Sequence, residues 1–103
     1  MPSTSIIIPC FNEAGAIERT VNQILAVISR ERTQRCELIV VDDGSTDGSR
    51  QRLEQLKKEK NHDQFQIILH ARNLGYGAAL KTGIQRSRAE LICITDADGT
   101  YPN

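Results

Sequence analysis

The sequence predicts an α/β protein in which a Rossmann-like, mostly parallel sheet carries helices on both faces. Four short apolar runs alternate with three longer stretches of helical character along the 103 residues. This order of strands and helices favours parallel strands joined by right-handed crossovers. Ligands bind such sheets beyond the carboxyl ends of the strands, near the point where the strand order reverses. Residues 1–103 are therefore expected to form one domain with its site at that edge.

The apolar runs are typical of short strands. The first of them is continuous and rich in β-branched residues, as expected for a strand that is covered on both faces. Pro9 is expected to end that strand, because proline has no N–H to donate to a ladder. The predicted strands are Ser5–Cys10, Glu37–Asp42, Gln66–His70 and Glu90–Thr95.

Three stretches between the strands are predicted to be helical. In the first, apolar residues recur at three- and four-residue spacing and form one stripe along a helix. The second is more polar, and its Leu53 and Leu56 are expected to face inward. The third, Tyr76–Ser87, has Leu80 and Ile84 one turn apart and several small residues that permit close packing on a sheet. The stripe of the first helix is Ile17, Val21, Ile24, Leu25 and Ile28, and the small residues of the third are Gly77, Ala78, Ala79 and Gly83.

Composition and charge exclude several classes of function. The 13 basic and 13 acidic residues cancel, so no overall field attracts nucleic acid or an anionic membrane surface. No apolar stretch approaches the roughly 18 residues of a membrane span, and the N-terminus lacks the layout of a signal peptide. Cys10, Cys36 and Cys93 include no close pair, which argues against a disulfide framework or a cysteine zinc site and favours buried free thiols. The chain is therefore expected to be a cytoplasmic protein without nucleic-acid partners.

Two aspartates follow the last predicted strand in the run Asp96-Ala97-Asp98. In an extended backbone, residues two apart point to the same side, so both carboxylates can reach one point. Carboxylate oxygens suit hard cations such as Mg²⁺ or Mn²⁺, which keep open positions for phosphate oxygens. A cation held there would neutralise a diphosphate leaving group. A solvated acidic turn is the alternative, since this spacing of aspartates is common.

A second acidic pair, Asp42-Asp43, ends the second predicted strand. Asp43 could accept a hydrogen bond from a nucleobase N–H, a contact of the kind that gives a pocket its specificity. Alternatively, the segment only forms a turn and caps the next helix through Ser45 or Thr46. The two interpretations are compatible, because Ser45 or Thr46 can cap the helix while Asp43 contacts the nucleobase.

The segment after the first strand, Pro9-Cys10-Phe11-Asn12-Glu13, also carries candidates for a nucleotide site. Phe11 could pack near a base or ribose, Asn12 could donate and accept hydrogen bonds, and Glu13 could bond a base or a ribose hydroxyl. In the alternative interpretation, Phe11 lies in the core and Asn12 is the N-cap of the next helix.

Arg72 follows the third predicted strand, in the run Arg72-Asn73-Leu74-Gly75. At a strand end its guanidinium could bind a diphosphate through its fork of donors. A solvated surface arginine is the alternative, and Lys81 on the following helix is expected to be solvated.

Together these motifs resemble those of the family 2 glycosyltransferases, and within that family those of the polyprenyl-phosphate sugar transferases similar to dolichyl-phosphate mannose synthase. The resemblance covers essentially the whole chain, and the motifs stand in the order and at the spacings of the family. The matching segments are Ile6–Glu13, Ile39–Gly48, Arg72–Gly77 and Thr95–Gly99.

The resemblance implies the GT-A fold, of which this chain would be the truncated N-terminal, nucleotide-sugar-binding part. The donor would be a UDP- or GDP-sugar held with Mg²⁺ or Mn²⁺, and the acceptor a polyprenyl phosphate or a glycan. Transfer would invert the anomeric centre with a catalytic base expected beyond residue 103, so the chain alone is expected to be inactive. The full-length protein could act at the cytoplasmic face of a membrane. By position, the nucleotide-binding residues would be Pro9, Phe11, Asn12, Glu13, Asp43, Arg72 and Asp96, and the metal ligands Asp98 and Asp96.

Three other functions fit parts of the sequence. Gly75-Tyr76-Gly77 before a helix, with an acid about twenty residues further on, partly matches a dinucleotide-binding fingerprint, but Leu80 replaces the third glycine. The acidic end of the second strand is similar to that of a signalling receiver domain, although a receiver opens with that strand. The chain could also bind nucleotide or a partner chain without catalysis. The last strand would leave a bare sheet edge, which favours self-association.

Overall fold

Strands and helices alternate along the chain, which confirms the predicted order. The computed structural model describes residues 4–30, 36–60 and 64–97. The predicted strand ends differ from the observed ones by no more than one residue, as is usual for element boundaries. None of the described helices has the length and apolar character needed to cross a membrane. The elements are β1 (Thr4–Cys10), α1 (Ile17–Arg30), β2 (Cys36–Asp42), α2 (Ser49–Lys60), β3 (Phe65–Leu69), α3 (Tyr76–Arg86) and β4 (Leu91–Ile94).

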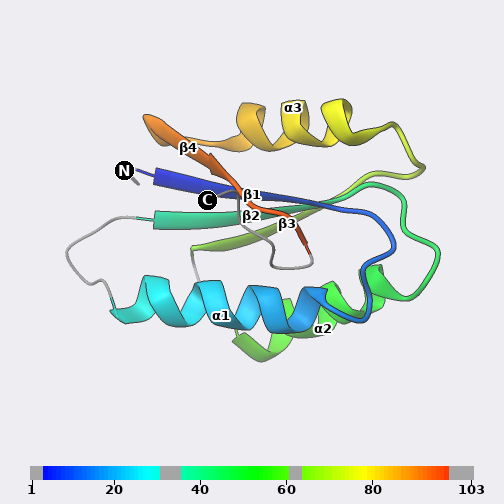
Figure 1. Ribbon diagram of the computed structural model, residues 1–103, viewed down its shortest axis with the longest axis horizontal. Coiled ribbons are helices and arrows are strands. Elements are labelled where there is room, and N and C mark those ends of the chain that lie inside the picture. The colour runs from blue at the N-terminus through cyan, green and yellow to red at the C-terminus, as the bar shows by residue number, and fades with distance from the viewer. Residues whose placement is uncertain (1–3, 31–35, 61–63, 98–103) are drawn as a thin grey trace.

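The four strands form a parallel sheet in the order β3-β2-β1-β4. Figure 1 shows α1 and α2 beneath the sheet and α3 above it, which confirms the prediction of helices on both faces. The chain passes from β1 to β2 and β3 in one direction and then crosses to the other side of β1 for β4. The strand order therefore reverses between β1 and β4, where sheets of this kind bind ligands.

The core lies on both faces of β2, whose residues 38–41 have no exposed surface. Successive side chains of a strand point to opposite faces, so Leu38 and Val40 pack against α1 and α2, whereas Ile39 and Val41 face α3. The apolar stripe of α1 and the two leucines of α2 are buried as predicted. A strand covered in this way needs a continuous apolar run, which is what the sequence of β2 provides.

The helix α3 packs on the sheet through its small residues. Ala79 and Gly83 are its buried positions, whereas 46% of Ile84 is exposed. A Cβ on Gly83 would lie 2.6 Å from Cγ2 of Ile7, so the helix backbone rests directly on β1. The predicted close packing through small residues is confirmed, and Leu80 is only partly buried against the same apolar cluster.

Pro9 lies inside β1 and does not end it, contrary to the expectation from sequence. Ile7 accepts a hydrogen bond from the N–H of Thr95 on the β4 side, and Cys10 accepts one from the N–H of Asp43 on the β2 side. By this alternation, the nitrogen of Pro9 is directed to the β4 side, and β4 ends opposite Ile7. Within the described strands, the proline therefore removes no ladder hydrogen bond.

A buried carboxylate joins several elements at the amino end of the sheet, opposite the predicted site. Glu37 on β2 is 5% exposed and accepts a hydrogen bond from the hydroxyl of Ser5 on β1. It also accepts from the N–H of Arg88 at 3.1 Å and from the side-chain amide of Gln66 at 3.3 Å. The hydroxyls of Ser5 and Ser87 share a further hydrogen bond. This network fastens the segment after α3 to the first residues of three strands.

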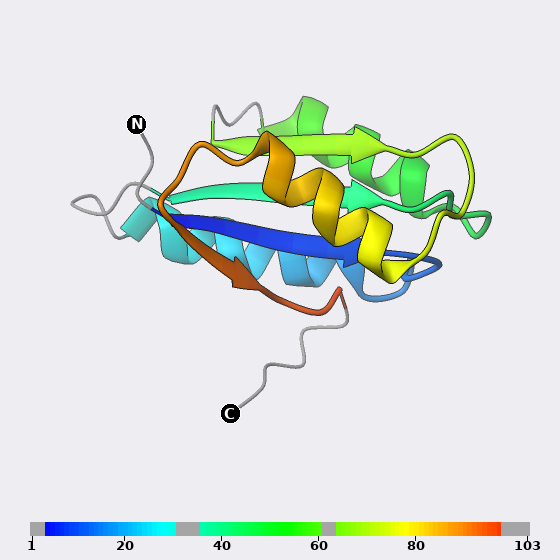
Figure 2. The same ribbon diagram turned by 90° about the horizontal axis from the view of Figure 1, so that it is seen from above.

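The strand β4 is an exposed sheet edge. All four of its residues are exposed, and the exposed fraction of Leu91 is 66%. Figure 2 shows β4 beside β1 at the margin of the sheet, clear of α3. Among the described residues, the outer edge of β4 has no partner strand. Self-association through this edge stays a prediction.

Candidate functional site

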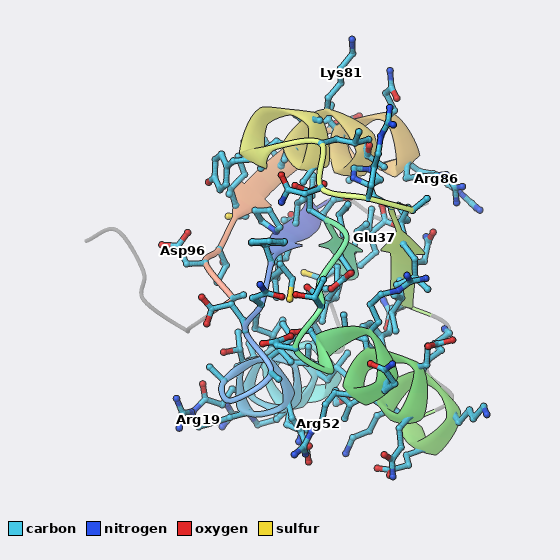
Figure 3. The ribbon with its side chains drawn as sticks, turned by 90° about the vertical axis from the view of Figure 1, so that its right-hand side faces the viewer. Arg19, Glu37, Arg52, Lys81, Arg86 and Asp96 are labelled. Atoms are coloured by element: carbon cyan, nitrogen blue, oxygen red, sulfur yellow. The ribbon has the colours of Figure 1, made fainter. Side chains whose placement is uncertain are left out.

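The loops that follow the strands gather at one edge of the sheet. In Figures 1 and 2, the loops after β1, β2 and β3 lie together at the end toward which these strands point. Figure 3 looks onto this edge and shows Asp96, which follows β4, at its margin. Residues 11–13, Asp43, Arg72 and Asp96 thus all follow parallel strands that end on this side of the sheet, and their roles in binding stay predictions.

A pocket of about 200 Å³ opens at this edge between the end of β1, the end of β2 and the start of α3. Phe11 and Tyr76 both line it, and their exposed fractions are 46% and 58%. The alternative in which Phe11 lies in the core is therefore wrong. Asp43 is the acidic residue of the lining. The full lining is Pro9, Cys10, Phe11, Asp43, Asn73, Gly75, Tyr76 and Ala79.

Five lining residues were not among the predicted site residues. Two of them are Cys10 at the end of β1 and Ala79 on α3, and the other three are Asn73, Gly75 and Tyr76. All three belong to the run after β3 that carried the family resemblance, so the signal was present in the sequence. What the sequence lacked was the contact that brings this run to the end of β2.

A larger hollow of about 460 Å³ lies on the helical layer, where the loop after β1 and the first half of α1 meet Arg52 of α2. An exposed ion pair crosses it, with 2.7 Å between Nη1 of Arg52 and Oε1 of Glu18. Figure 3 shows Arg19 and Arg52 at the foot of the helical layer, far from α3. No predicted site residue lines this hollow, so the pocket beside Asp43 is the candidate site.

The carboxylate of Asp43 is held by three donors. Its Oδ1 accepts from the N–H of Leu74 at 2.9 Å and lies 2.8 Å from Nδ1 of His70, and its Oδ2 accepts from the N–H of Gly75 at 2.9 Å. Burial alone would raise the pKa of Asp43, but the hydrogen bonds from His70, Leu74 and Gly75 outweigh burial and lower that pKa. The pocket therefore contains a carboxylate that is fixed in orientation and ionised at neutral pH.

Gly44 lets the loop after β3 approach the end of β2. Its φ of +75° is in the left-handed region, and a Cβ there would lie 2.4 Å from the carbonyl carbon of Arg72 and from the nitrogen of Asn73. Only glycine satisfies both conditions without movement of the neighbouring backbone. This close approach lets the N–H groups of Leu74 and Gly75, in the loop after β3, donate to Asp43.

Asn12 joins the loop after β1 to the loop after β2. Its side-chain Oδ1 accepts from the N–H of Thr46 at 2.8 Å, and its own N–H donates to Oγ of Ser45 at 2.9 Å. Its φ of +54° is one that asparagine tolerates better than most residues. Asn12 is not the N-cap of α1, because the first N–H groups of that helix donate to the carbonyl of Glu13.

A second set of bonds joins the same two loops through Asp47. Its Oδ2 accepts from the N–H of Ala14 at 3.0 Å, and its Oδ1 accepts from the N–H of Ser49 at 3.0 Å and from the Ser49 hydroxyl. The N–H of Glu13 donates to Oγ of Ser49. Burial would raise the pKa of Asp47, but these donors, led by the Ser49 hydroxyl, lower it. Asp47, rather than Ser45 or Thr46, therefore caps α2.

Of the residues predicted to bind the diphosphate and the metal ion, the structure describes Arg72 and Asp96. Arg72 is exposed in the loop after β3, as expected for a group that meets a ligand or solvent. Asp96 is exposed, and the backbone on either side of it is fixed, since Thr95 donates to Ile7 and the carbonyl of Ala97 accepts from the hydroxyl of Thr20. Asp98 lies outside the described residues. Within the described part of the chain, no group of three or more His, Cys, Asp or Glu side chains is arranged to hold a metal ion.

The cysteines differ in their surroundings, and all three are free. Burial, reinforced by the charge of Asp42, raises the pKa of Cys10 to about 12. The prediction of buried thiols holds for Cys10 and is wrong for Cys93, which is exposed because β4 is an edge strand. We expect iodoacetamide at mildly alkaline pH to modify Cys93 rapidly and to spare Cys10, as measured by mass spectrometry of the digested protein. Equal modification of both thiols in the folded chain would contradict this account.

Comparisons with known proteins agree with this fold. The sequence model of the family described as "Glycosyl transferase family 2" matches residues 5–103. The chain is 35% identical over 98 residues to a dolichyl-phosphate beta-glucosyltransferase of Saccharomyces cerevisiae, covering 92% of this chain and 29% of that protein. It is 34% identical over 98 residues to an undecaprenyl-phosphate 4-deoxy-4-formamido-L-arabinose transferase of Pseudomonas fluorescens, covering 95% and 28%. The chain thus spans less than a third of the length of these relatives.

Two solved structures are similar to the chain. One is the mannosyltransferase PcManGT from Pyrobaculum calidifontis in complex with GDP-Man and Mn²⁺, with a TM-score of 0.84, 28% identity, and coverage of 99% of this chain and 29% of that chain. The other is GalNAc-T7 with UDP, GalNAc and Mn²⁺, with a TM-score of 0.71, 26% identity, and coverage of 94% and 18%. These likenesses confirm the fold that the motifs implied. Because the family match extends over almost the whole chain, this protein belongs to glycosyl transferase family 2.

Proposed function

We propose that this chain is the donor-binding part of a glycosyltransferase that transfers a sugar, with inversion, from a UDP- or GDP-sugar to a polyprenyl phosphate or a glycan. The observation that carries the proposal is the pocket beside Asp43, at the carboxyl edge of the sheet, in a chain of this family. The similar structures with GDP-Man and with UDP support a nucleotide sugar as the donor. The relatives named as dolichyl-phosphate and undecaprenyl-phosphate transferases support a polyprenyl phosphate as the acceptor.

Asp43 is the group proposed to contact the nucleobase. An ionised carboxylate can accept about four hydrogen bonds, and the described contacts use two on Oδ1 and one on Oδ2. The remaining lone pair of Oδ2 can accept from a ring N–H, which uracil carries at N3 and guanine at N1. Phe11 and Tyr76 offer apolar surface for the base or the ribose, and Pro9 lines the same pocket.

Asn12 and Glu13 are proposed to act at the same pocket in different ways. The side chain of Asn12 holds the loop after β2 in place, so its contribution is to the shape of the site. The carboxylate of Glu13 is half-buried beside that loop and could accept from a ribose hydroxyl.

Arg72 and the acidic turn after β4 are proposed to bind the diphosphate. A guanidinium forms strong, charge-assisted hydrogen bonds with phosphate oxygens. The carboxylates of Asp96 and Asp98 have the oxygen ligands that Mg²⁺ and Mn²⁺ prefer, and Asp96 is exposed next to the point where the strand order reverses. A cation bound there would neutralise the diphosphate as it leaves. We propose that the catalytic base is supplied by residues outside this chain. We therefore expect the chain alone to bind the donor without transferring sugar.

Calorimetric titration of UDP and GDP, with and without Mn²⁺, tests the proposal. We expect one nucleotide to bind, and Mn²⁺ to tighten its binding, because the cation bridges the diphosphate and the acidic turn. The variant Asp98→Asn should lose roughly tenfold or more of the Mn²⁺-dependent affinity, about the effect of removing one charged ligand. The variant Glu59→Gln, which changes an exposed acid on α2, serves as the matched control and should bind as the wild type does. Equal affinity with and without Mn²⁺ in all three proteins would contradict the metal role, and absence of binding in folded protein would contradict the donor site.

A further inference from the structure

His70 lies directly behind Asp43 and connects it to α3. It follows β3 and is 9% exposed, and its backbone N–H donates to the carbonyl of Asp42 at 2.8 Å. Its ring Nδ1 is 2.8 Å from Oδ1 of Asp43, and its Nε2 is 2.8 Å from the hydroxyl of Thr82. The imidazole is thus held at both nitrogens between the proposed base-contacting carboxylate and a helix that lines the same pocket.

The hydrogen-bond partners determine which nitrogen of His70 carries a proton. An ionised carboxylate only accepts, so Nδ1–H must donate to Asp43. The hydroxyl of Thr82 has one proton and lies 3.0 Å from the carbonyl oxygen of Ala78 as well as near Nε2. If that proton goes to Ala78, Nε2 donates and the ring is charged; if it goes to Nε2, the ring is neutral. Both arrangements keep Nδ1–H on Asp43.

This contact determines which acceptor positions of the Asp43 carboxylate stay open to a ligand. Together with the N–H of Leu74, His70 fills the two lone pairs of Oδ1, and Gly75 fills one of Oδ2. In the part of the chain that the structure describes, the open acceptor position is therefore on Oδ2. Without His70, an acceptor position on Oδ1 would open as well, and the carboxylate could meet a ligand in more than one orientation.

We propose that His70 is a positioning residue that sets nucleobase selectivity by fixing the carboxylate of Asp43 toward the ring N–H of the base. The inference rests on the proposed function, since it requires that Asp43 contacts the base. His70 itself is not expected to contact the nucleotide, because both of its ring nitrogens already bond Asp43 and Thr82.

The test compares nucleotides with and without the ring N–H. UDP, GDP, 3-methyl-UDP and 1-methyl-GDP are titrated into the full chain with Mn²⁺, and selectivity is the Kd of the methylated form divided by that of its parent. For the parent that binds more tightly, we expect a selectivity of roughly tenfold or more in the wild type, about the effect of one charged hydrogen bond. The variant His70→Asn can place an amide N–H near the position of Nδ1 and should keep the selectivity. The variant His70→Gln, whose amide reaches the position of Nε2, should lose most of it.

The outcomes separate a positioning role from a structural one. A residue that only stabilised the fold would change the affinities for parent and methylated nucleotide together and leave their ratio unchanged. Selectivity that survives His70→Gln, or that is lost equally in His70→Asn, would overturn the inference. Selectivity that survives Asp43→Asn would instead overturn the proposed base contact. A wild-type chain that binds none of the nucleotides would overturn both.

A spectroscopic measurement keeps the inference testable if a His70 variant does not fold. The ¹⁵N and ¹H resonances of the wild-type imidazole should show a protonated Nδ1 that persists whether or not Nε2 is protonated. A neutral ring protonated only at Nε2 would overturn the inference, because Asp43 would then lack this donor.

Discussion

The substitution Gly44→Ala is expected to destabilise the chain by about 2–5 kcal/mol, the sum of left-handed backbone strain and steric overlap. The residue has a φ of +75°, and the new Cβ would lie 2.4 Å from backbone atoms of Arg72 and Asn73. Because that contact is with backbone, no side-chain rotation relieves it. The loop after β3 must move away, which also removes the N–H donors of Leu74 and Gly75 from Asp43.

Two other glycines provide matched controls for Gly44. Gly48 has a φ of +100° but open space around its Cβ position, so Gly48→Ala should cost only the backbone strain of about 1–2 kcal/mol. Gly15 has open space and no such φ, so Gly15→Ala should change stability by no more than about 1 kcal/mol. Urea unfolding followed by circular dichroism measures all three. A Gly44→Ala chain as stable as the Gly15→Ala chain would contradict the close approach of the two loops.

The substitution Glu37→Ala is expected to destabilise the chain by about 2–4 kcal/mol, because it removes the shared acceptor of one buried and two partly buried donors. The N–H of Arg88 and the amide of Gln66 lose their described bonds to this carboxylate, and the hydroxyl of Ser5 keeps only Ser87. The segment between α3 and β4 should loosen first, since it loses the bond from Arg88 to Glu37 and keeps the one between the hydroxyls of Ser87 and Ser5.

The control for Glu37→Ala removes an acceptor that is exposed. Glu59 accepts a hydrogen bond from Gln55 at 3.0 Å on the surface of α2, so Glu59→Ala should change stability by no more than about 0.5 kcal/mol. Thermal unfolding of both variants gives the comparison. Similar losses in the two variants would show that the network at the amino end of the sheet contributes little.

Most of the fold could be predicted because local patterns and the layer architecture agree. The continuous apolar runs of β1 and β2 indicate strands covered on both faces, and the stripe on α1 indicates one buried side. The effect of Pro9 could not be predicted from the sequence, because it depends on the side of the strand to which its nitrogen is directed, which only the pairing with β4 decides. The exposure of Cys93 likewise depends on the position of β4 at the sheet edge, which the apolar run itself does not encode.

The sequence predicts which loops form the site, but it does not predict the hydrogen bonds that join them. Acidic residues after β2 and β4 lie at strand ends in the sequence, and parallel pairing brings those ends to one edge. The bonds from Asn12 to Thr46 and from His70 to Asp43 span 34 and 27 positions, so they depend on strand register and not on local propensity. The cap of α2 by Asp47 could not be predicted either, because Ser45 and Thr46 are equally good capping residues by type.

The most direct test of the central claim is to locate the nucleotide on the chain by NMR. Uniformly ¹⁵N-labelled protein is titrated with UDP and then with GDP in the presence of Mg²⁺, and the amide shifts are mapped onto the sequence. We predict that the nucleotide that binds shifts the amides of Phe11, Leu74 and Gly75 and leaves those of Glu37 and Arg88, at the opposite edge of the sheet, unchanged. Shifts centred on the hollow between α1 and α2, or no shifts with either nucleotide at saturating concentration, would contradict a donor site beside Asp43.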